Sequence, residues 1–164
     1  MTTHIALLRA INVAGHQPVS MADLRAFATE LGLRNVRTLL QSGNLVFDTS
    51  KSNVAQLLER EAEKRLGLTT DFVVRTADEW DEVVRRNPFP DAAKNDPGRL
   101  VVLFTKEPVV SFEWSGPEIV KPDGRQVYVI YPNGQGRSRL KLPRGTARNW
   151  NTVLKLQSNA RVAP

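Results

Sequence analysis

The spacing of apolar residues near the start of the chain predicts a strand followed by a helix. Residues 5–13 are apolar at both odd and even positions, as in a central strand covered on both faces, and Arg9 interrupts the run. Residues 21–31 carry apolar side chains at helical spacing, after a Ser20-x-x-Asp23 pattern that approximates a capping box. We therefore expect a buried strand and then a core-facing helix.

The next segments extend this pattern to a strand, helix, strand, strand, helix, strand order. A tight turn at residues 42–44 is the strongest hairpin signal in the chain. The remaining expected elements are strands over residues 35–41 and 45–47, a helix over 54–66 and a strand over 70–75. This order is that of the ferredoxin-like split βαβ arrangement.

That arrangement would gather polar residues that are distant in sequence at one edge of the sheet. They are Asn12, the loop at residues 15–16 and the turn at residues 41–44. Such a cluster could hydrogen-bond a small polar ligand or the edge of a base. The simpler interpretation is that Ser42 and Asn44 satisfy the backbone of the hairpin.

The second half of the chain predicts a smaller set of elements. Thr76-x-x-Glu79 is a full capping box for a helix that the prolines of residues 87–90 end, and residues 91–98 read as a polar linker. Residues 108–114 fit a short helix or an irregular segment. The other expected elements are a strand over 100–105, a hairpin of 118–121 with 126–131, and a last helix capped by Thr146 with Trp150, Val153 and Leu154 inward.

Together these elements predict an α+β protein with two lobes. The expected division is a ferredoxin-like lobe over residues 1–75, a connecting helix and linker over 76–98, and a second, smaller α+β lobe over 99–164. The second lobe would contain a β-hairpin and the C-terminal helix. Its basic segment precedes that helix.

Composition narrows the classes of protein and of site. With 41% hydrophobic and 24% charged residues, the chain has the balance of an ordinary globular protein. It has no cysteine, which excludes disulfides, a thiolate nucleophile and iron–sulfur ligation, and this fits a cytoplasmic protein. The apolar run after His4 is too short for a signal peptide or a membrane span, so we expect no membrane association.

The charge of the chain is unevenly distributed. Up to Asp123 there are 15 Lys and Arg against 17 Asp and Glu, whereas the remaining residues hold 8 Lys and Arg and no acid. This asymmetry favours an anionic partner, such as nucleic acid, a nucleotide or an acidic protein face. The alternative is a solvated basic surface without a specific ligand.

The inventory of catalytic residues is poor. There are two histidines, His4 and His16, and no Gly-x-Ser-x-Gly elbow, metal-ligand spacing, Walker A motif or Rossmann glycine pattern. We therefore predict no metal and no cofactor, and the sequence leaves open whether the protein is an enzyme. Arg9 must either pair with a carboxylate or bind a ligand, because burying it alone is costly.

The candidate ligand-binding residues are cations and amides from both lobes. They are Arg9, Asn12, Asn44, Arg137, Arg139, Lys141, Arg144, Arg148 and Asn149. The cations up to Arg144 lack a structural explanation, whereas Arg148 and Asn149 belong to the expected last helix. Trp150 could stack on a base, but its helical spacing favours core packing.

Three functions are consistent with these residues. The leading hypothesis is a binding module for anionic ligands, RNA or DNA phosphates among them, through the basic C-terminal segment. The second is an enzyme that acts on a small phosphorylated or carboxylate substrate between the lobes, with Arg9, Asn12, Asn44, Arg148 and Asn149 as binders. The third is a protein-interaction module that meets an acidic partner.

Four motifs resemble the bacterial family called domain of unknown function 1697. They are residues 7–13 (LLRAINV), 41–47 (QSGNLVF), 87–89 (NPF) and 146–153 (TARNWNTV). The resemblance covers nearly the whole chain and implies a two-lobed α+β fold with ferredoxin-like character and no established activity.

The sequence departs from the pattern of that family at several positions. Ala10 and Ala14 stand where glycine is usual, Ala147 stands where threonine is common, and the segment between Ser138 and Thr146 is short. The first two alanines argue against a strand end that needs glycine to let a phosphate approach the backbone.

Overall fold

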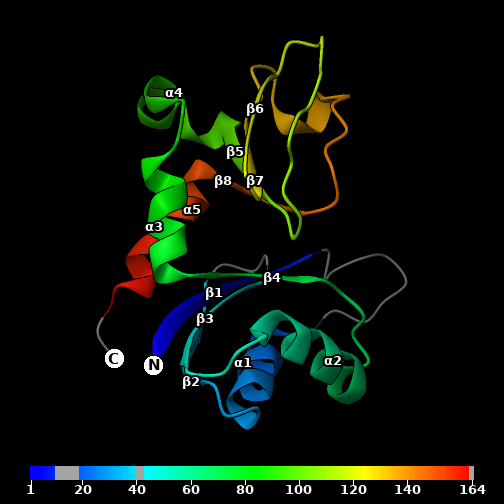
Figure 1. Ribbon diagram of the computed structural model, residues 1–164, viewed down its shortest axis with the longest axis vertical. Helices are drawn as coiled ribbons and strands as arrows, with labels where there is room; N and C mark the ends of the chain where they lie inside the picture. The colour runs from blue at the N-terminus through cyan, green and yellow to red at the C-terminus, as the bar shows by residue number, and fades with distance from the viewer. Residues whose placement is uncertain (10–18, 40–42, 163–164) are drawn as a thin grey trace. The chain divides into compact units, whose positions relative to one another are not determined.

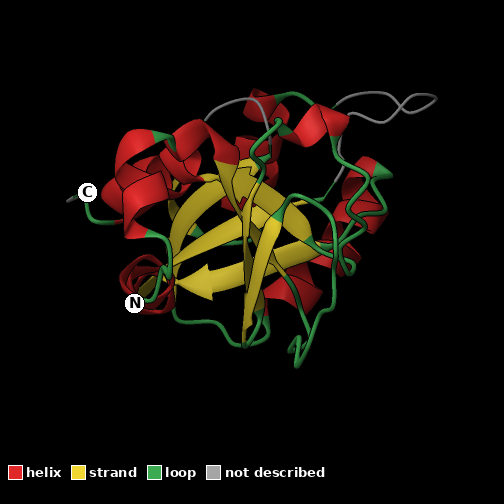
Figure 2. Cartoon of the chain, turned by 90° about the horizontal axis from the view of Figure 1, so that it is seen from above, coloured by secondary structure: helices red, strands yellow, loops and turns green. Residues whose placement is uncertain are grey.

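The computed structural model describes residues 1–9, 19–39 and 43–162, and the chain forms two compact units. The first unit comprises Met1–Trp80 and Leu156–Pro164, and the second comprises Asp81–Lys155. Each unit contains a four-stranded antiparallel sheet, so the fold is mixed α+β (Figures 1 and 2). No helix in the described part of the chain is long and apolar enough to span a membrane.

The first unit has the expected order of elements. They are β1 (Thr2–Leu8), α1 (Met21–Glu30), β2 (Arg34–Thr38), β3 (Asn44–Thr49), α2 (Val54–Leu66) and β4 (Phe72–Thr76). All neighbouring strands in the sheet, whose order is β2-β3-β1-β4, are antiparallel. Ser20 caps α1, because its hydroxyl accepts a hydrogen bond of 3.0 Å from the backbone N–H of Asp23.

The bounds of the strands differ from the predicted ones. β1 ends at Leu8, so Arg9 follows the strand and does not interrupt it. The predicted strand over residues 35–41 is β2, which ends at Thr38, and Asn44 is the first residue of β3. The remainder of the predicted first strand, with Asn12, the loop at residues 15–16 and residues 41–42, lies outside the described residues.

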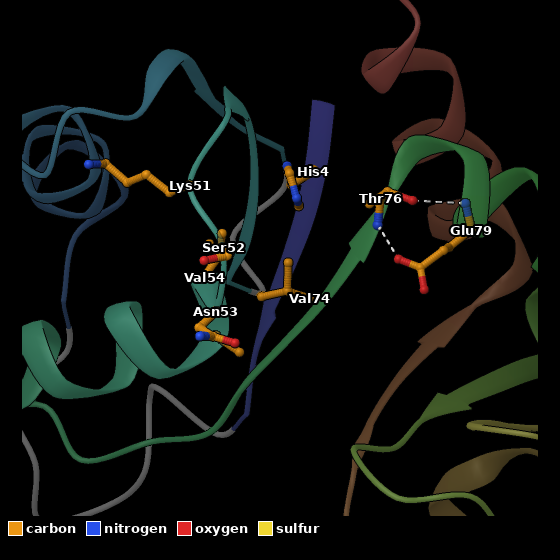
Figure 3. Close-up of a pocket in the computed structure, with 9 residues that line it drawn as sticks. His4, Lys51, Ser52, Asn53, Val54, Val74, Thr76 and Glu79 are labelled. Atoms are coloured by element: carbon orange, nitrogen blue, oxygen red, sulfur yellow. Dashed lines mark hydrogen bonds between the residues drawn. The ribbon is translucent and has the colours of Figure 1, made fainter. Parts of the chain in front are cut away.

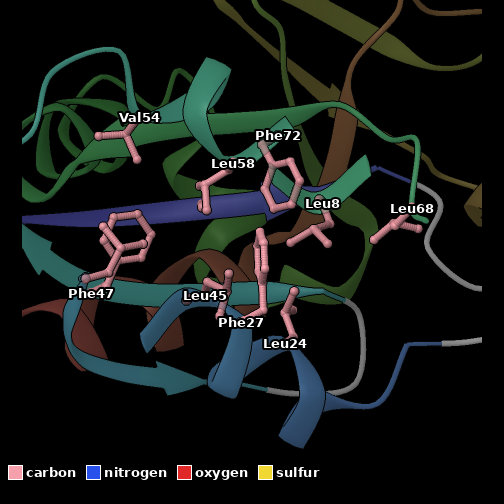
Figure 4. Close-up of a cluster of buried hydrophobic side chains, with 13 residues drawn as sticks. Leu8, Leu24, Phe27, Leu45, Phe47, Val54, Leu58, Leu68 and Phe72 are labelled. Carbon is pink, nitrogen blue, oxygen red and sulfur yellow. The ribbon is translucent and has the colours of Figure 1, made fainter. Parts of the chain in front are cut away.

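The core of the first unit fills the space between one face of its sheet and the two helices α1 and α2. Figure 4 shows Phe27 from α1 and Leu58 from α2 meeting Phe47 and Phe72 from the sheet. These four side chains are almost completely buried. The apolar stripes that predicted both helices therefore face one shared core.

The second unit contains the predicted hairpin and a strand that the sequence pattern missed. Its strands are β5 (Leu100–Phe104), β6 (Ile119–Asp123), β7 (Gln126–Ile130) and β8 (Thr146–Asn149), in the sheet order β6-β7-β5-β8. Thr146 was expected to cap the last helix, but it begins β8, which pairs with β5 from Phe104↔Thr146 to Val101↔Asn149. The helix α5 (Trp150–Ala160) begins four residues later.

Asn149 performs the capping function that the sequence assigned to Thr146. Its side-chain oxygen accepts a hydrogen bond of 3.0 Å from the backbone N–H of Thr152. The inner face of α5 includes Trp150 and Val153 as predicted, but Leu154 is 39% exposed and Leu156 is buried in its place. Trp150 is thus the first residue of the helix and is buried, as predicted.

The segment between the two predicted lobes is more regular than expected. α3 (Ala77–Arg85) begins with the predicted capping box, in which the Thr76 N–H donates to Glu79 and the Glu79 N–H donates to the Thr76 hydroxyl. The linker contains a short helix, α4 (Pro90–Asn95), followed by a 3-10 turn, η1 (Pro97–Arg99). Pro90 suits the first turn of a helix, where its missing N–H has no intrahelical partner.

The sheet of the second unit has two differently covered faces. On one face, Val101, Leu103, Val127, Val129 and Tyr131 form a cluster against which Leu140 and Leu142 pack. On the opposite face, alternation along the strands places Val102, Tyr128 and Arg148 in register. There the Tyr128 hydroxyl donates a hydrogen bond of 2.6 Å to the carbonyl of Val83 in α3.

Candidate functional site

The four cations before β8 form an outward-facing series, which we call the cation row. It consists of Arg137, Arg139, Lys141 and Arg144, all of which are exposed. Leu140 and Leu142 alternate with the cations and pack against the core cluster of the second unit. Alternation of inward and outward residues is the geometry of extended backbone, so the partly buried leucines hold the intervening cations in solvent.

The start of the cation row is fastened to the protein by a buried carboxylate. Ser138 lies between the first two cations, and its hydroxyl donates a hydrogen bond of 3.0 Å to Oε2 of Glu118. The other oxygen of Glu118 accepts a hydrogen bond of 2.8 Å from the indole N–H of Trp114. Glu118 is only 8% exposed, so its charge is directed into this network and is largely withdrawn from the surface.

The pKa of Glu118 is consistent with a charged carboxylate that accepts these two hydrogen bonds. Burial raises the pKa of its carboxyl, but hydrogen bonds from Trp114, the backbone and Ser138 outweigh that effect, and the pKa lies below the usual value of 4.5. The carboxylate is therefore charged at neutral pH. It acts as an acceptor for both neighbours.

Trp114 was not identified as a functional candidate from the sequence, which pointed to Trp150. Trp150 is 4% exposed and packs in the core, whereas Trp114 is 37% exposed. It lies in residues 105–118, a segment without regular secondary structure. The glycine two residues after Trp114 was the sequence feature that accompanies this position. A Cβ at Gly116 would lie 2.5 Å from the indole nitrogen of Trp114, so a larger residue there would displace the ring.

Arg148 and Asn149 are two further predicted ligand-binding residues. Both side chains make hydrogen bonds within the fold. Arg148 is 9% exposed and donates hydrogen bonds to the Thr146 hydroxyl (2.7 Å) and the Ala147 carbonyl (2.9 Å). Burial lowers the pKa of Arg148 to about 10. Asn149 is exposed, but its side-chain oxygen is engaged in capping α5. The structure therefore does not group these two residues with the cation row.

The predicted residues of the first unit are likewise engaged in local contacts. Arg9 pairs with Asp71, which is one of the two alternatives expected, with 4.0 Å between Nη1 and Oδ2. The Arg9 side chain is 39% exposed, so the pair is not fully buried. Asn44 is completely buried and donates a hydrogen bond of 2.9 Å to the Leu39 carbonyl across the hairpin. Asn12 lies outside the described residues.

A cavity of about 270 Å³ opens beside the start of α2 in the first unit (Figure 3). Two of its polar residues, Thr76 and Glu79, form the capping box of α3. His4 stacks on Phe47 with 5.7 Å between ring centroids, and its Nδ1 lies 2.9 Å from the Thr2 carbonyl. These contacts stabilise the fold and do not constitute a nucleophile with its base.

Metal ligation has no support in the described ranges. No group of three or more His, Asp or Glu side chains in residues 1–9, 19–39 and 43–162 is arranged to hold a metal ion. The cation row with its Trp114 neighbour is consequently the polar surface with the clearest ligand chemistry.

Comparison with known proteins identifies relatives of unestablished activity. The family described as "Protein of unknown function (DUF1697)" matches residues 1–131. A solved structure of a conserved bacterial protein, SP0830 from Streptococcus pneumoniae, superposes with a TM-score of 0.73 at 23% sequence identity, covering 98% of this chain and 99% of that one. At this identity the likeness concerns the fold alone. No curated protein sequence matches the chain.

Proposed function

The chain belongs to the protein family of unknown function DUF1697, and we propose that it is a binding module for anionic ligands. The ligand class that we propose is nucleic acid, RNA or DNA, whose phosphates would contact the cation row. Arginine and lysine are the side chains that most often contact phosphate oxygens, and they do so without reading sequence.

The observation that supports this proposal most is that three cations of the cation row make no ion pair with a carboxylate of the described residues. Within the described part of the chain, Arg137, Arg139 and Lys141 have no carboxylate partner, in contrast to Arg65 and Arg86, which pair with Glu61 and Asp123. No acidic residue follows Asp123 in the sequence. A ligand phosphate could therefore approach these three cations without displacing an existing ion pair.

We also infer that the first unit is a ferredoxin-like lobe. Its order of elements and its sheet order, β2-β3-β1-β4 with antiparallel neighbours, support this inference. Function does not follow from the resemblance of topology, because many unrelated sites occur on such folds. The proposed ligand class therefore depends on the cation row of the second unit.

The proposal is tested by the salt dependence of binding to a labelled single-stranded oligonucleotide, measured by fluorescence anisotropy. Release of counterions should make the logarithm of affinity fall linearly with the logarithm of salt concentration, by about 0.7 per phosphate contacted. Arg139→Ala and Lys141→Ala should each remove one phosphate contact, weaken binding and reduce the slope by about 0.7.

The matched control is Lys64→Ala, which removes one exposed cation from α2 of the first unit. It changes the net charge equally and should leave the slope unchanged. If Lys64→Ala reduces affinity as much as Lys141→Ala, the attraction is general to the protein and the cation row is not the site. Absence of binding at low salt would contradict the proposal as a whole.

A further inference from the structure

Trp114 differs from the other two tryptophans of the chain in its exposure. Trp80 and Trp150 are 0% and 4% exposed and belong to the core, whereas 37% of Trp114 is accessible. A partly exposed indole offers an aromatic face to a ligand. An aromatic ring does not bind a phosphate group, so Trp114 would contact a different part of the ligand.

The exposed indole is held in one orientation by two contacts. Its N–H donates a hydrogen bond of 2.8 Å to Glu118, and its ring rests against the backbone of Gly116, where an added Cβ would lie 2.5 Å from the indole nitrogen. These contacts lie along the edge of the ring that carries the indole nitrogen, and they reduce the freedom that a ligand would have to remove on binding. A surface ordered in advance binds more tightly because less entropy is lost.

The indole is joined by hydrogen bonds through Glu118 to Ser138, which lies in the chain between the first two residues of the cation row. Oε1 of Glu118 accepts from Trp114, and Oε2 of the same carboxylate accepts a bond of 3.0 Å from Ser138. Ser138 is flanked in sequence by Arg137 and Arg139, both exposed. Two hydrogen bonds to one carboxylate therefore connect the indole to the residue between these arginines.

The exposed indole is an aromatic surface on which a neutral, planar group can stack. The exposed arginines on either side of Ser138 attract phosphates. The surface therefore suits a ligand in which flat neutral groups alternate with phosphates.

We propose that the ligand of the cation row is a single-stranded nucleic acid, one of whose unpaired bases stacks on Trp114 while its phosphates contact Arg137 and Arg139. This inference rests on the proposed function and specifies its ligand. Single-stranded binding sites combine cations that follow the backbone with aromatic rings on which bases stack. In a duplex the bases face one another and are not available to the ring.

The test compares two labelled probes of equal length, an oligothymidylate and an abasic oligonucleotide with the same number of phosphates. Trp114→Ala should weaken binding of the oligothymidylate roughly 5- to 100-fold and leave binding of the abasic probe unchanged. Trp114→Phe, which keeps an aromatic face, should retain most of the affinity. Val110→Ala, at a 94% exposed residue of the same loop, is the matched control and should have no effect.

Tryptophan fluorescence provides a second readout that does not depend on a variant being fully stable. Because Trp80 and Trp150 are buried, quenching by the oligothymidylate should come from Trp114 and should disappear in Trp114→Phe. Gly116→Ala should reduce this quenching as well, since the added methyl group displaces the ring without removing it.

The outcomes separate this inference from the proposed function. If both probes bind equally and Trp114→Ala affects neither, stacking is refuted while phosphate binding stands. If neither probe binds at low salt, both proposals fail. Equal affinity for polyglutamate would indicate an acidic protein partner and would overturn the assignment to nucleic acid.

Discussion

Two stretches that follow each other in the chain place arginines in opposite environments. In the cation row, Arg139 is exposed and the leucine after it packs inward, on the face of the second sheet that carries the apolar cluster. In β8, Arg148 is buried beside Val102, and it is the small Ala147 that packs against that cluster. The difference teaches that the register of the backbone, more than residue type, decides whether a cation is available to a ligand.

Gly145 separates the two stretches, and its replacement should have the largest effect on stability. A Cβ at this position would lie 2.4 Å from the carbonyl oxygen of Phe104, which is backbone of β5 and cannot simply rotate away. We expect Gly145→Ala to lower the free energy of unfolding by about 3 kcal/mol, because it forces β8 away from its partner strand. Urea denaturation measures this loss.

Gly136→Ala is the matched control for that substitution. No heavy atom lies within 4 Å of the Cβ that it would add, and the residue precedes the first cation of the row. The change should be neutral, or should stabilise by about 0.4–1 kcal/mol by restricting the unfolded chain. Equal losses in the two variants would show that close approach to Phe104 does not constrain the junction.

Arg148→Ala should have the next largest effect, of about 2 kcal/mol on the free energy of unfolding. The substitution removes buried packing and leaves the hydrogen-bond acceptors at Thr146 and Ala147 without this donor. Arg139→Ala is the comparison variant and should change stability by less than about 0.5 kcal/mol, since its side chain is exposed.

Binding should rank the same two variants in the reverse order. Folded Arg148→Ala protein should keep its affinity for the oligonucleotide, while Arg139→Ala weakens it. The contrast between the two stretches would be wrong if Arg148→Ala were as stable as the wild type and reduced binding as strongly as Arg139→Ala.

The smallest expected effect is a pH dependence that involves Glu118. Its pKa in the folded protein is depressed, so the stability it contributes is present above the usual value of 4.5 and is lost as pH falls through the folded pKa. The difference in unfolding free energy between wild type and Glu118→Gln should therefore be larger at pH 7 than at acid pH. Arg148 stays charged throughout this range and should show no such convergence.

This comparison is made by urea denaturation of both proteins at neutral pH and at successively lower pH. A difference that grows as the solution is acidified would contradict the assigned direction of the pKa shift. The Glu118→Gln variant also reports on Trp114, whose fluorescence should become easier to quench if the carboxylate holds the ring.

Local patterns predicted those elements whose signals are contained within a few residues. The capping box at Thr76 and Glu79 and the hairpin of β6 and β7 are of this kind, because each depends on hydrogen bonds between near neighbours. The division into lobes of residues 1–75 and 99–164 stays a prediction. The concentration of cations in the segment up to Arg144 was also predictable, because it is read directly from the composition.

The remaining features depend on residues far apart in sequence. Both Thr146 and Asn149 are acceptable N-caps, and only the pairing of β8 with β5 makes the second one start the helix. Trp114 could not be told from Trp150 by residue type, because the exposure of each depends on what packs against it.

The sequence by itself determined the α+β class, the order of elements in the first unit and the concentration of positive charge near the end of the chain. These are properties of periodicity, capping and composition, which act over short distances. The tertiary structure alone decided that Arg148 is buried, that the cation row is exposed and that Glu118 joins Trp114 to Ser138. Strand pairing and side-chain burial bring distant residues together, and no local pattern specifies which ones will meet.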